Sequence, residues 1–423
     1  MTSFQTLKGF KDLLPEDAGR WEFISSLAKT TFDLYGFSMI ATPIIEPTDL
    51  FTRSIGAGTD IVEKEMYTFD DYGKEVSLRP EGTACAVRAY LEHPSLSQLT
   101  LAKLYYIGPM FRRERPQAGR LRQFHQIGAE IIGEGSPQQE IELLSFLFDF
   151  FEQLHLSDLT LELNSIGCPI CRPVHRQTLQ TFLENQISAL CEDCARRFLT
   201  NPLRILDCKK EVCKTATQNA PAPKDFLCPE CDEHFKAVQT GLNQLDIAYQ
   251  INPRLVRGLD YYTKTAFEIT TTLLGAQNTV AAGGRYDGLV EMLGGRKTSA
   301  VGFAIGIERL AALIQPENRS VSAMLKPPLL LYIAPLGTEA RAFLLPILFS
   351  LRKKKMKSEM GTETHGLKSQ MKQANKLAAE FVLIVGDTEL RTGKGILRNM
   401  TTHEQEEIKL TRLMENIMER LKP

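Results

Sequence analysis

Arginine side chains are concentrated in one short segment of the chain, residues 112–122. The sequence RRERPQAGRLR holds five arginines in eleven residues around a Pro-Gln-Ala-Gly turn. A guanidinium binds phosphate oxygens in pairs and keeps its proton near neutral pH. An ordinary solvated surface is the alternative, but arginines gathered around one turn fit a polyphosphate-binding loop better. Neither a GxxxxGK[ST] loop nor a GxGxxG motif occurs in the sequence, so phosphate would have to be bound by these arginines.

The segment RQFHQIGAEIIG, residues 122–133, follows this loop and alternates as a β-strand does. Alternation places Arg122, Phe124, Gln126, Gly128 and Glu130 on one face. Gln126 and Glu130 flank Gly128, whose missing side chain leaves a space above the sheet. A solvent-facing strand edge is the plain interpretation. A small polar ligand on the sheet is the other, and the adjacent arginines favour it.

These residues need a sheet to position them, and the flanking sequence supplies its strands. YYIGPMFRRE precedes the loop, and TAFEITT, VAAGGRY and SAVGFAIGI come later, the last leading into the helix-like ERLAALI. The pattern predicts an α+β domain built on an antiparallel sheet. A helical, cysteine-rich stretch at about residues 167–237 interrupts it as an insertion.

The chain resembles the class II aminoacyl-tRNA synthetases, and specifically the histidyl-tRNA synthetase family, along essentially its whole length. GFSMIATPIIEPTDLF resembles the first class motif, which implies that Pro43 belongs to a dimer interface. YYIGPMFRRERPQAGRLRQFHQIGAE resembles the second motif and VGFAIGIERL the third. LVRGLDYYTKTAFEI and AAGGRYDGL, which are more specific to the histidine enzymes, occur in the expected order.

The resemblance implies a site for L-histidine. Glu81 and Thr83 of LRPEGTA would receive the α-amino group, with Gln126 helping, since an ammonium needs acceptors. Glu130 and Tyr262 would hold the imidazole ring. Tyr261 and Tyr286 would form the walls, for which core packing is the alternative.

The resemblance also implies a site for ATP, with Mg²⁺ bridging its outer phosphates. Arg112 and Arg257 would converge on the α-phosphate, where the histidine carboxylate attacks and pyrophosphate leaves. This reaction needs positioning and charge neutralisation more than a protein base. The remaining nucleotide contacts would come from Glu114, Arg120, Phe124 and Arg309.

Eight of the nine cysteines fall between Cys168 and Cys231. They form three CxxC pairs, with Cys208 and Cys213 more widely spaced between the second and third pairs. Eight thiols could close two tetrahedral zinc sites. The resemblance does not require zinc, so free thiols are favoured over zinc and no metal ligand is assigned, whereas disulfides are disfavoured in a reducing cytosol. We expect the insertion to lie outside the active site and to close over the acceptor stem of tRNA.

The two ends of the chain differ in charge. Residues 328–423 carry 16 Lys and Arg against 11 Asp and Glu, a balance of +5, so the remainder of the −1 chain carries −6. Lys368, Lys372 and Lys376 recur every four residues and share a helix face. A solvated face is the alternative to a phosphate-binding one. The resemblance assigns this end to anticodon binding.

We therefore expect a class II catalytic domain at 1–320, a polar linker at QPENRSVSAMLKPP, and an α/β anticodon-binding domain with a largely parallel sheet at 328–423. No apolar run has the length of a membrane span, and the charged start does not resemble a secretory signal, so a cytoplasmic location is expected. The expected partners are tRNA(His), L-histidine, ATP and a second copy of the chain.

Two other functions remain open. One is a histidine-sensing regulatory subunit of ATP phosphoribosyltransferase, which reuses the same catalytic fold but lacks the anticodon domain. The other is a zinc-dependent nucleic-acid-binding module, which leaves the arginine loop and the segment RGLDYY unexplained. The leading hypothesis is ATP-dependent ligation of histidine to tRNA through a histidyl-adenylate.

Overall fold

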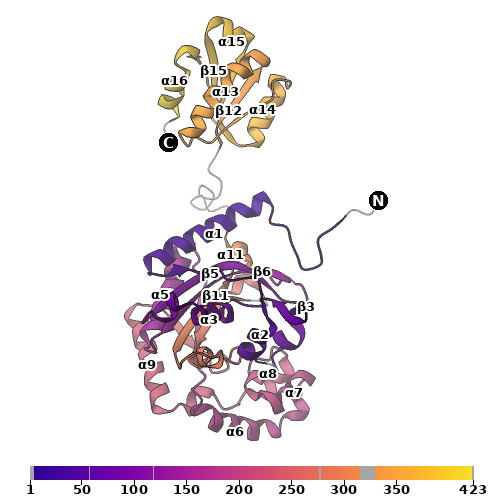
Figure 1. The fold of residues 1–423 in the computed structure, drawn as a ribbon, viewed down its shortest axis with the longest axis vertical. Helices are drawn as coiled ribbons and strands as arrows, with labels where there is room; N and C mark the ends of the chain where they lie inside the picture. Colours follow the sequence, from indigo (N-terminus) through magenta and orange to yellow (C-terminus); the bar gives the residue numbers. More distant parts are fainter. Residues whose placement is uncertain (1–3, 57, 118, 276–277, 315–328, 422–423) are drawn as a thin grey trace. The chain divides into compact units, whose positions relative to one another are not determined.

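The computed structural model describes residues 4–56, 58–117, 119–275, 278–314 and 329–421. The chain divides into two compact units, Met1–Pro316 and Glu317–Pro423 (Figure 1). The linker expected at residues 315–328 lies outside the described residues. None of the described helices is both long enough and apolar enough to cross a lipid bilayer.

An eight-stranded sheet forms the centre of the first unit. Its strands run in the order β1-β5-β6-β11-β10-β9-β7-β8, with six antiparallel strands from β5 to β7 and a parallel edge strand on each side. In that order the strands are Ser38–Met39, Ala102–Phe111, Gln123–Gly133, Ser299–Gly306, Thr279–Arg285, Thr263–Thr270, Thr160–Ser165 and Tyr249–Ile251. The structure thus confirms the predicted α+β fold.

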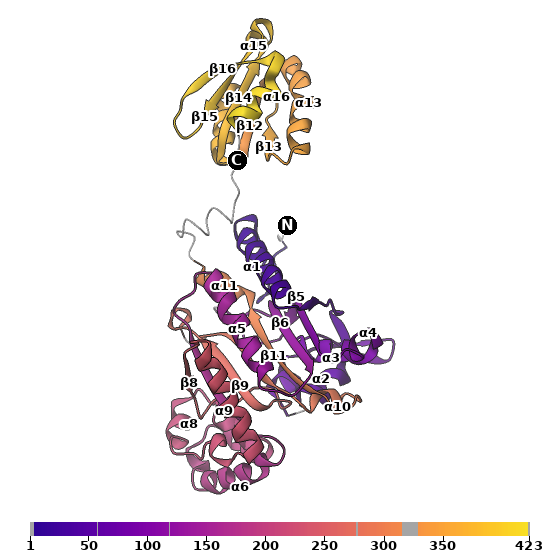
Figure 2. The ribbon, with the colours of Figure 1, turned by 90° about the vertical axis from the view of Figure 1, so that its left-hand side faces the viewer.

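Helices cover both faces of this sheet. On one face lie α1 (Pro15–Leu34) and α5 (Gln138–Gln153) (Figure 2). They pack through Phe32, whose ring stacks on Tyr105 of β5 at 4.3 Å and on Phe146 of α5 at 4.2 Å. The short helix α11 (Ile307–Leu313) follows β11 directly. The opposite face carries α2 (Thr48–Ile55), α3 (Thr83–Glu92), α4 (Pro94–Ser97) and α10 (Leu289–Met292).

A small antiparallel sheet in the order β2-β4-β3 lies beside α2. Its strands are Ile45–Pro47, Lys74–Leu78 and Tyr67–Asp71.

The cysteine-rich insertion leaves the main sheet after β7 and returns to it at β8. It consists of α6 (Cys171–Glu184), α7 (Glu192–Thr200), α8 (Glu211–Ala216), α9 (Pro229–Gln244) and three short 3₁₀ turns. Residues 167–237 contain no strand, as the sequence predicts. The last helix continues past the expected boundary to Gln244.

The second unit is a five-stranded sheet in the order β13-β12-β14-β15-β16. Its strands are Ser358–Met360, Leu329–Leu336, Ala379–Gly386, Lys394–Asn399 and Gln405–Lys409. Its helices are α13 (Thr338–Lys353), α14 (Leu367–Lys376), α15 (Asp387–Thr392) and α16 (Leu413–Arg420).

This sheet is mixed, so the prediction of a largely parallel sheet is wrong. The β12 strand pairs in parallel with β13 and β14, whereas β14, β15 and β16 pair antiparallel. Only residues 400–404 connect β15 to β16. A parallel crossover needs a dozen or more residues, so this short connection requires an antiparallel hairpin.

Candidate active site

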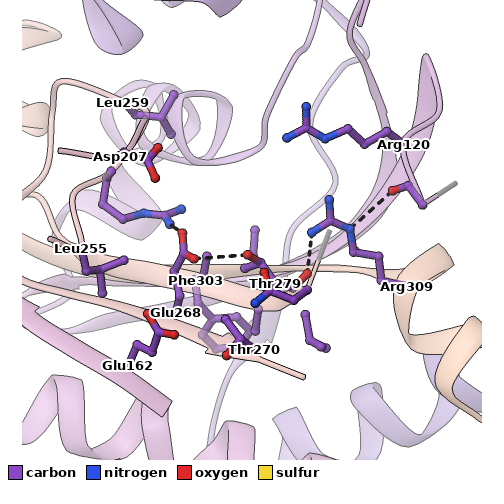
Figure 3. Close-up of a pocket in the computed structure, with 18 of the residues that line it drawn as sticks. Arg120, Glu162, Asp207, Leu255, Leu259, Glu268, Thr270, Thr279, Phe303 and Arg309 are labelled. Atoms are coloured by element: carbon purple, nitrogen blue, oxygen red, sulfur yellow. Dashed lines mark hydrogen bonds and ion pairs between the residues drawn. The ribbon is translucent and has the colours of Figure 1, made fainter. Parts of the chain in front are cut away.

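A cavity of about 870 Å³ opens on the main sheet of the first unit (Figure 3). Eleven of the thirteen predicted site residues line it: Glu81, Thr83, Arg112, Glu114, Arg120, Phe124, Gln126, Arg257, Tyr261, Tyr262 and Arg309. The other two, Glu130 and Tyr286, are buried and are not among the lining residues. The fold thus brings together segments that lie more than 200 residues apart in the sequence.

The arginine loop joins β5 to β6 at one end of the cavity. The Arg112 guanidinium donates from Nε to the Pro80 carbonyl at 2.9 Å and lies 5.3 Å from the centre of the Phe124 ring. Arg120 forms an ion pair with Glu114 at 2.8 Å. These contacts hold two guanidinium groups and an aromatic ring at the cavity. The guanidinium groups could bind a nucleotide phosphate, and the ring could stack on a base.

Arg309 approaches the same end from α11. Its guanidinium donates from Nε to the Gly119 carbonyl at 3.4 Å and from Nη1 to the Thr279 carbonyl. Figure 3 shows Arg309 and Arg120 projecting into the same region from different elements. The third-motif arginine and the loop arginine therefore face one volume.

Arg257 lies at a different wall of the cavity, before β9. It forms an ion pair with Glu268 of β9, and its guanidinium lies 5.3 Å from the centre of the Tyr262 ring. Its Nε is buried and has no hydrogen-bond partner among the described residues. Thr279 donates to the other Glu268 oxygen at 3.2 Å. Glu268 therefore orients Arg257, whose Nε is left unpaired.

Acceptors gather at the start of α3. The Glu81 carboxylate accepts from the backbone N–H groups of Thr83 at 2.6 Å and Ala84 at 2.8 Å. Burial raises the pKa of Glu81, and these two N–H donors oppose the rise. The Gln126 amide oxygen is buried and has no partner among the described residues. An unpaired buried acceptor is costly, so this part of the cavity fits a cationic donor.

Glu130 lies on β6, is fully buried, and receives hydrogen bonds from three hydroxyl groups. Thr83 donates to it at 2.7 Å, Tyr106 at 3.1 Å, and Tyr286 donates to the other carboxylate oxygen. Burial raises the pKa of Glu130 to about 8, and the hydroxyl donors oppose the rise. None of these three hydrogen-bond partners is a cation. The carboxyl group of Glu130 could therefore bind a ligand that carries a positive charge or an N–H donor.

Three glycines make room for Glu130 and its neighbours. A Cβ on Gly302 would lie 1.8 Å from a Glu130 oxygen, and Cβ atoms on Gly82 and Gly128 would lie 2.2 Å from the Tyr106 ring. The space predicted above Gly128 therefore exists, but Tyr106 fills it. Tyr106 pairs directly across from Gly128 in the β5–β6 register. We refer to Glu130, Tyr106 and these three glycines, which are buried and are not themselves lining residues, as the pocket floor.

The three predicted tyrosines form one aromatic group. The ring centres of Tyr261 and Tyr262 lie 4.7 Å apart, and Tyr286 meets Tyr261 edge-on at 5.5 Å. Tyr261 and Tyr262 line the cavity, whereas Tyr286 lies among the buried residues and donates to Glu130. Tyr286 therefore lies behind Tyr261 and next to Glu130, and its place in the wall of the histidine site stays a prediction.

The insertion also reaches the cavity, which corrects the expectation that it stays outside the site. Leu206, Asp207, Cys208, Lys209 and Lys214 are lining residues. The reason is that Arg254, just before the RGLDYY segment, binds the insertion backbone, donating to the carbonyls of Thr217 at 2.8 Å and Leu206 at 3.1 Å.

The sequence interpretation missed Tyr106 and Glu268. Tyr106 lies in the quoted segment YYIGPM, and only the pairing register shows that it faces Gly128. Glu268 is the one acidic residue inside the apolar strand segment TAFEITT. An isolated charge inside a strand pattern was the available signal.

An antiparallel sheet with arginines on a strand–loop–strand motif beside its cavity, in a sequence without a glycine-rich phosphate loop, is the arrangement of a class II aminoacyl-tRNA synthetase. A family model described as histidyl-tRNA synthetase matches residues 9–310, and one described as an anticodon binding domain matches residues 331–420. The chain therefore belongs to the histidyl-tRNA synthetase family, which confirms the resemblance found in the sequence.

Individual relatives agree along nearly the whole chain. A histidine–tRNA ligase of Desulfatibacillum aliphaticivorans is 51% identical over 412 residues, 97% of each chain. One of Geobacter sulfurreducens is 50% identical over 406 residues, 96% of this chain and 97% of that protein. The crystal structure of apo S. aureus histidyl-tRNA synthetase superposes with a TM-score of 0.82 at 36% identity, covering 98% of this chain and all of that one.

Proposed function

We propose that this protein ligates L-histidine to tRNA(His) in two steps. The histidine carboxylate attacks the α-phosphorus of ATP, giving histidyl-adenylate and pyrophosphate. The terminal ribose hydroxyl of tRNA then attacks the adenylate carbonyl and releases AMP. The observation that carries the proposal is that one cavity holds arginines from three separate segments beside a group of buried, partly unpaired acceptors.

The acceptor end of the cavity fits histidine. Its ammonium group would bind Glu81, Thr83 and the unpaired Gln126 oxygen. Its imidazole would reach Glu130 and Tyr262, with Tyr261 and Tyr286 packing around it. Since Thr83, Tyr106 and Tyr286 already bind Glu130, the ring would displace or share one of these hydroxyls. A ligand lacking the ring nitrogens would leave these buried groups unpaired, which provides specificity.

The arginine end fits ATP. Arg112 and Arg257 would neutralise the α-phosphate, Phe124 would stack on adenine beside Glu114, and Arg120 and Arg309 would bind the outer phosphates. Mg²⁺ usually takes one or two carboxylates together with substrate phosphates. Other carboxylates line the cavity, among them Asp207 and Glu268, so the donor set fits a magnesium ion that arrives bound to ATP. Its charge would help neutralise the leaving pyrophosphate.

Exchange of labelled pyrophosphate into ATP tests the first step. We expect exchange only when histidine is present. Arg257→Ala should lower it about 100- to 1000-fold, the effect of removing one preorganised charge from a transition state. Arg53→Ala is the matched control, because Arg53 is exposed on α2 with only a 3.9 Å ion pair. Unchanged exchange in folded Arg257→Ala would refute the role of Arg257.

The regulatory-subunit alternative is less well supported. It lacks an anticodon domain, whereas residues 331–420 match that domain here. Histidine binding without any exchange, in folded protein, would favour the alternative over the ligase.

The second unit would bind the anticodon region of tRNA. Lys368, Lys372 and Lys376 are all exposed on α14, whose buried side contains Gln370 and Ala374. Changing the three lysines to Gln should weaken tRNA binding and make the slope of log K against log salt shallower by about 1 for each phosphate that is no longer neutralised. Lys394→Gln, on β15, is the control. An unchanged salt slope would leave these lysines as a solvated face.

The first-motif segment would form a dimer interface. Apolar side chains are exposed around its proline, Pro43: Met39, Ile44 and Ile45 are 55%, 42% and 48% exposed. They lie at β1 and β2, on an edge of the main sheet and in the small sheet. An exposed apolar group at strand edges is typical of an association surface.

A further inference from the structure

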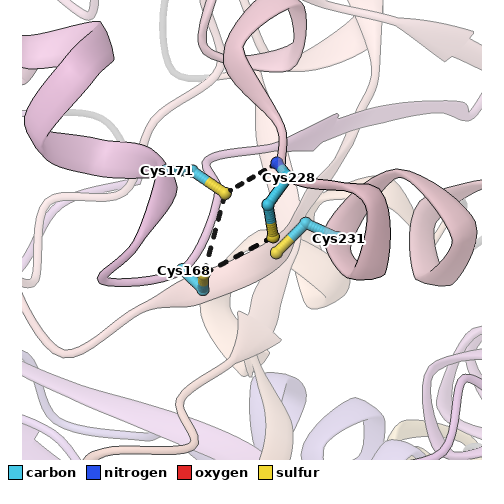
Figure 4. A group of neighbouring side chains, drawn as sticks. All are labelled: Cys168, Cys171, Cys228 and Cys231. Carbon is cyan, nitrogen blue, oxygen red and sulfur yellow. Dashed lines mark hydrogen bonds between the residues drawn. The ribbon is translucent and has the colours of Figure 1, made fainter.

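The eight cysteines of the insertion gather into two groups of four. In the outer tetrad, Cys168, Cys171, Cys228 and Cys231 place their sulfurs within 4.8 Å of one another (Figure 4). In the inner tetrad, Cys191, Cys194, Cys208 and Cys213 do the same. The two groups are nested in the sequence, because all four cysteines of the inner tetrad lie between Cys171 and Cys228 of the outer tetrad. Each tetrad therefore joins segments that the sequence keeps apart.

Helix starts present most of these sulfurs. Cys228 precedes α9 and Cys231 lies in its first turn, and Cys191 and Cys194 occupy the same positions on α7. Cys171 is the first residue of α6. The positive end of a helix dipole stabilises a thiolate. A CxxC pair at a helix start also directs both sulfurs to one side.

The distances between sulfurs fit a shared ion and not disulfide bonds. Cys168 lies 3.6 Å from Cys171 and 3.9 Å from Cys228, and Cys191 lies 4.0 Å from Cys208. A disulfide bond is about 2.05 Å long. Four sulfurs at about 2.3 Å from a tetrahedral zinc ion would be about 3.8 Å apart. These three spacings lie around that value, and the sulfurs of each tetrad all lie within 4.8 Å of one another.

The backbone donates to the sulfurs as it would to thiolates. Cys171 Sγ accepts from the Cys228 N–H at 3.1 Å, Cys168 Sγ from Ile170 at 3.4 Å, and Cys213 Sγ from Cys191 at 3.2 Å. Four thiolates around a divalent ion leave a net charge of −2, so such donors stabilise the complex. Arg172, next to Cys171, also interacts electrostatically with the outer tetrad.

We propose that each tetrad binds one structural Zn²⁺ ion through four thiolates. A closed set of four cysteines leaves no position for substrate, which is the mark of a structural site. Each ion would replace the four thiol protons, and its binding free energy would contribute to folding. The insertion has four helices and no strand to stabilise it, and small segments of this kind commonly need such a crosslink.

The outer tetrad adjoins the wall of the candidate active site. Arg172 donates to the backbone carbonyl of Tyr262, and the Lys264 N–H donates to the Gly167 carbonyl at 3.0 Å. A Cβ on Gly167 would lie 2.7 Å from Cys171 Cβ, so this residue lets the chain approach the tetrad. A metal ion here would fix the base of the insertion against β9. The inner tetrad includes Cys208, which lines the cavity.

Metal analysis of the full-length chain, purified without chelator, tests the proposal. We expect two zinc ions per chain. Cys228→Ser and Cys208→Ser should each retain one, and the double variant none. Cys85→Ser is the matched control, because Cys85 is buried outside both tetrads and its variant should retain two. The readout is metal content, so it is independent of ligase activity.

A second measurement, made on the wild-type protein, tests zinc binding even where a cysteine variant does not fold. Chelator-treated wild-type protein titrated with Co²⁺ should develop the absorption of tetrahedral thiolate-bound cobalt up to two equivalents, and Zn²⁺ should abolish it. In denaturant with chelator and no reductant, all nine thiols should react. The proposal would be overturned by metal analysis that finds iron in place of zinc, only one zinc site, or less than about a tenth of an equivalent of zinc. It would also be overturned by seven or fewer reactive thiols in the denatured chain.

Discussion

Two fully buried glutamates in the first unit have opposite surroundings. Glu130 on β6 has three hydroxyl donors and no cation among its hydrogen-bond partners, and burial raises its pKa to about 8. Glu140 on α5 is enclosed by the Arg285 guanidinium, His234 at 2.6 Å and Thr265 at 3.1 Å. Although burial opposes it, the hydrogen bonds and charges of Arg285 and His234 lower the pKa of Glu140.

This difference in partners indicates that Glu130 serves to bind a ligand, whereas Glu140 stabilises the fold. Glu140 and Arg285 form an ion pair that connects α5 to β10, and the Arg285 guanidinium also donates to Asp287 and to the Ser136 carbonyl. Glu130 is left without its counter-charge beneath the cavity, a state that the unbound protein tolerates by keeping a proton. Of these two buried glutamates, the one without a charged partner is therefore the one that lies at the candidate site.

Breaking the structural pair should have the largest effect. Arg285→Met leaves Glu140 buried without its main partner, and we expect a loss of about 3–5 kcal/mol in the free energy of unfolding of the first unit. Urea unfolding followed by circular dichroism measures it. Arg53→Met makes the same change in an exposed ion pair and should stay within about 1 kcal/mol. Equal losses in the two variants would contradict the distinction.

Glu130→Gln should have a small effect on stability and a large effect on activity. At pH 4 the carboxyl group holds its proton in the folded protein and largely also in the unfolded chain, and an amide imitates that form, so stability should change by no more than about 1 kcal/mol. Histidine-dependent pyrophosphate exchange should fall about 100-fold or more in kcat/KM, because the imidazole loses its partner. Glu92→Gln, at an exposed pair with Arg88, is the control. Full activity in Glu130→Gln would remove Glu130 from the histidine site.

The pH dependence of stability sharpens the comparison, with a smaller change for each pH unit. The pKa of Glu130 is raised from 4.5 to about 8, so its contribution to stability is complete below pH 4.5 and is lost as the pH rises to about 8. Glu140 has a lowered pKa, so its contribution is present above pH 4.5 and is lost on acidification. Each slope is at most about 1.4 kcal/mol per pH unit.

Unfolding curves of wild type, Glu130→Gln and Glu140→Gln across this pH range measure both contributions. The wild-type advantage over Glu130→Gln should fall as the pH rises. The advantage over Glu140→Gln should grow instead. Slopes of the same sign would show that the two carboxylates share one environment.

Much of the site could be predicted from the sequence because strand alternation and the arginine cluster are local patterns. The strands around Gln126 and Arg112 are where alternation places them, and the family motifs identified residues that the fold collects in one cavity. The placement of Tyr286 beside Glu130 could not be read from the chain. It depends on how β10 and β11 align, which local periodicity does not determine.

Strand register and tertiary packing, which local periodicity does not determine, also explain the other features that the sequence did not predict. Tyr106 fills the space at Gly128 only because their strands pair in that register. The contact between Arg254 and the insertion depends on tertiary packing. In the second unit, β16 (Gln405–Lys409) contains QEEIK, whose charges hide a strand at the sheet edge.

The glycines of the pocket floor also determine how this protein can vary. Gly82, Gly128 and Gly302 each lie so close to Tyr106 or Glu130 that even one methyl group would collide, and a packed interior has little space for relaxation. In a saturation mutagenesis screen for growth, these positions should reject nearly every substitution, alanine included. Tolerated changes would then accumulate at the cavity rim, leaving the floor as the least mutable part of the molecule.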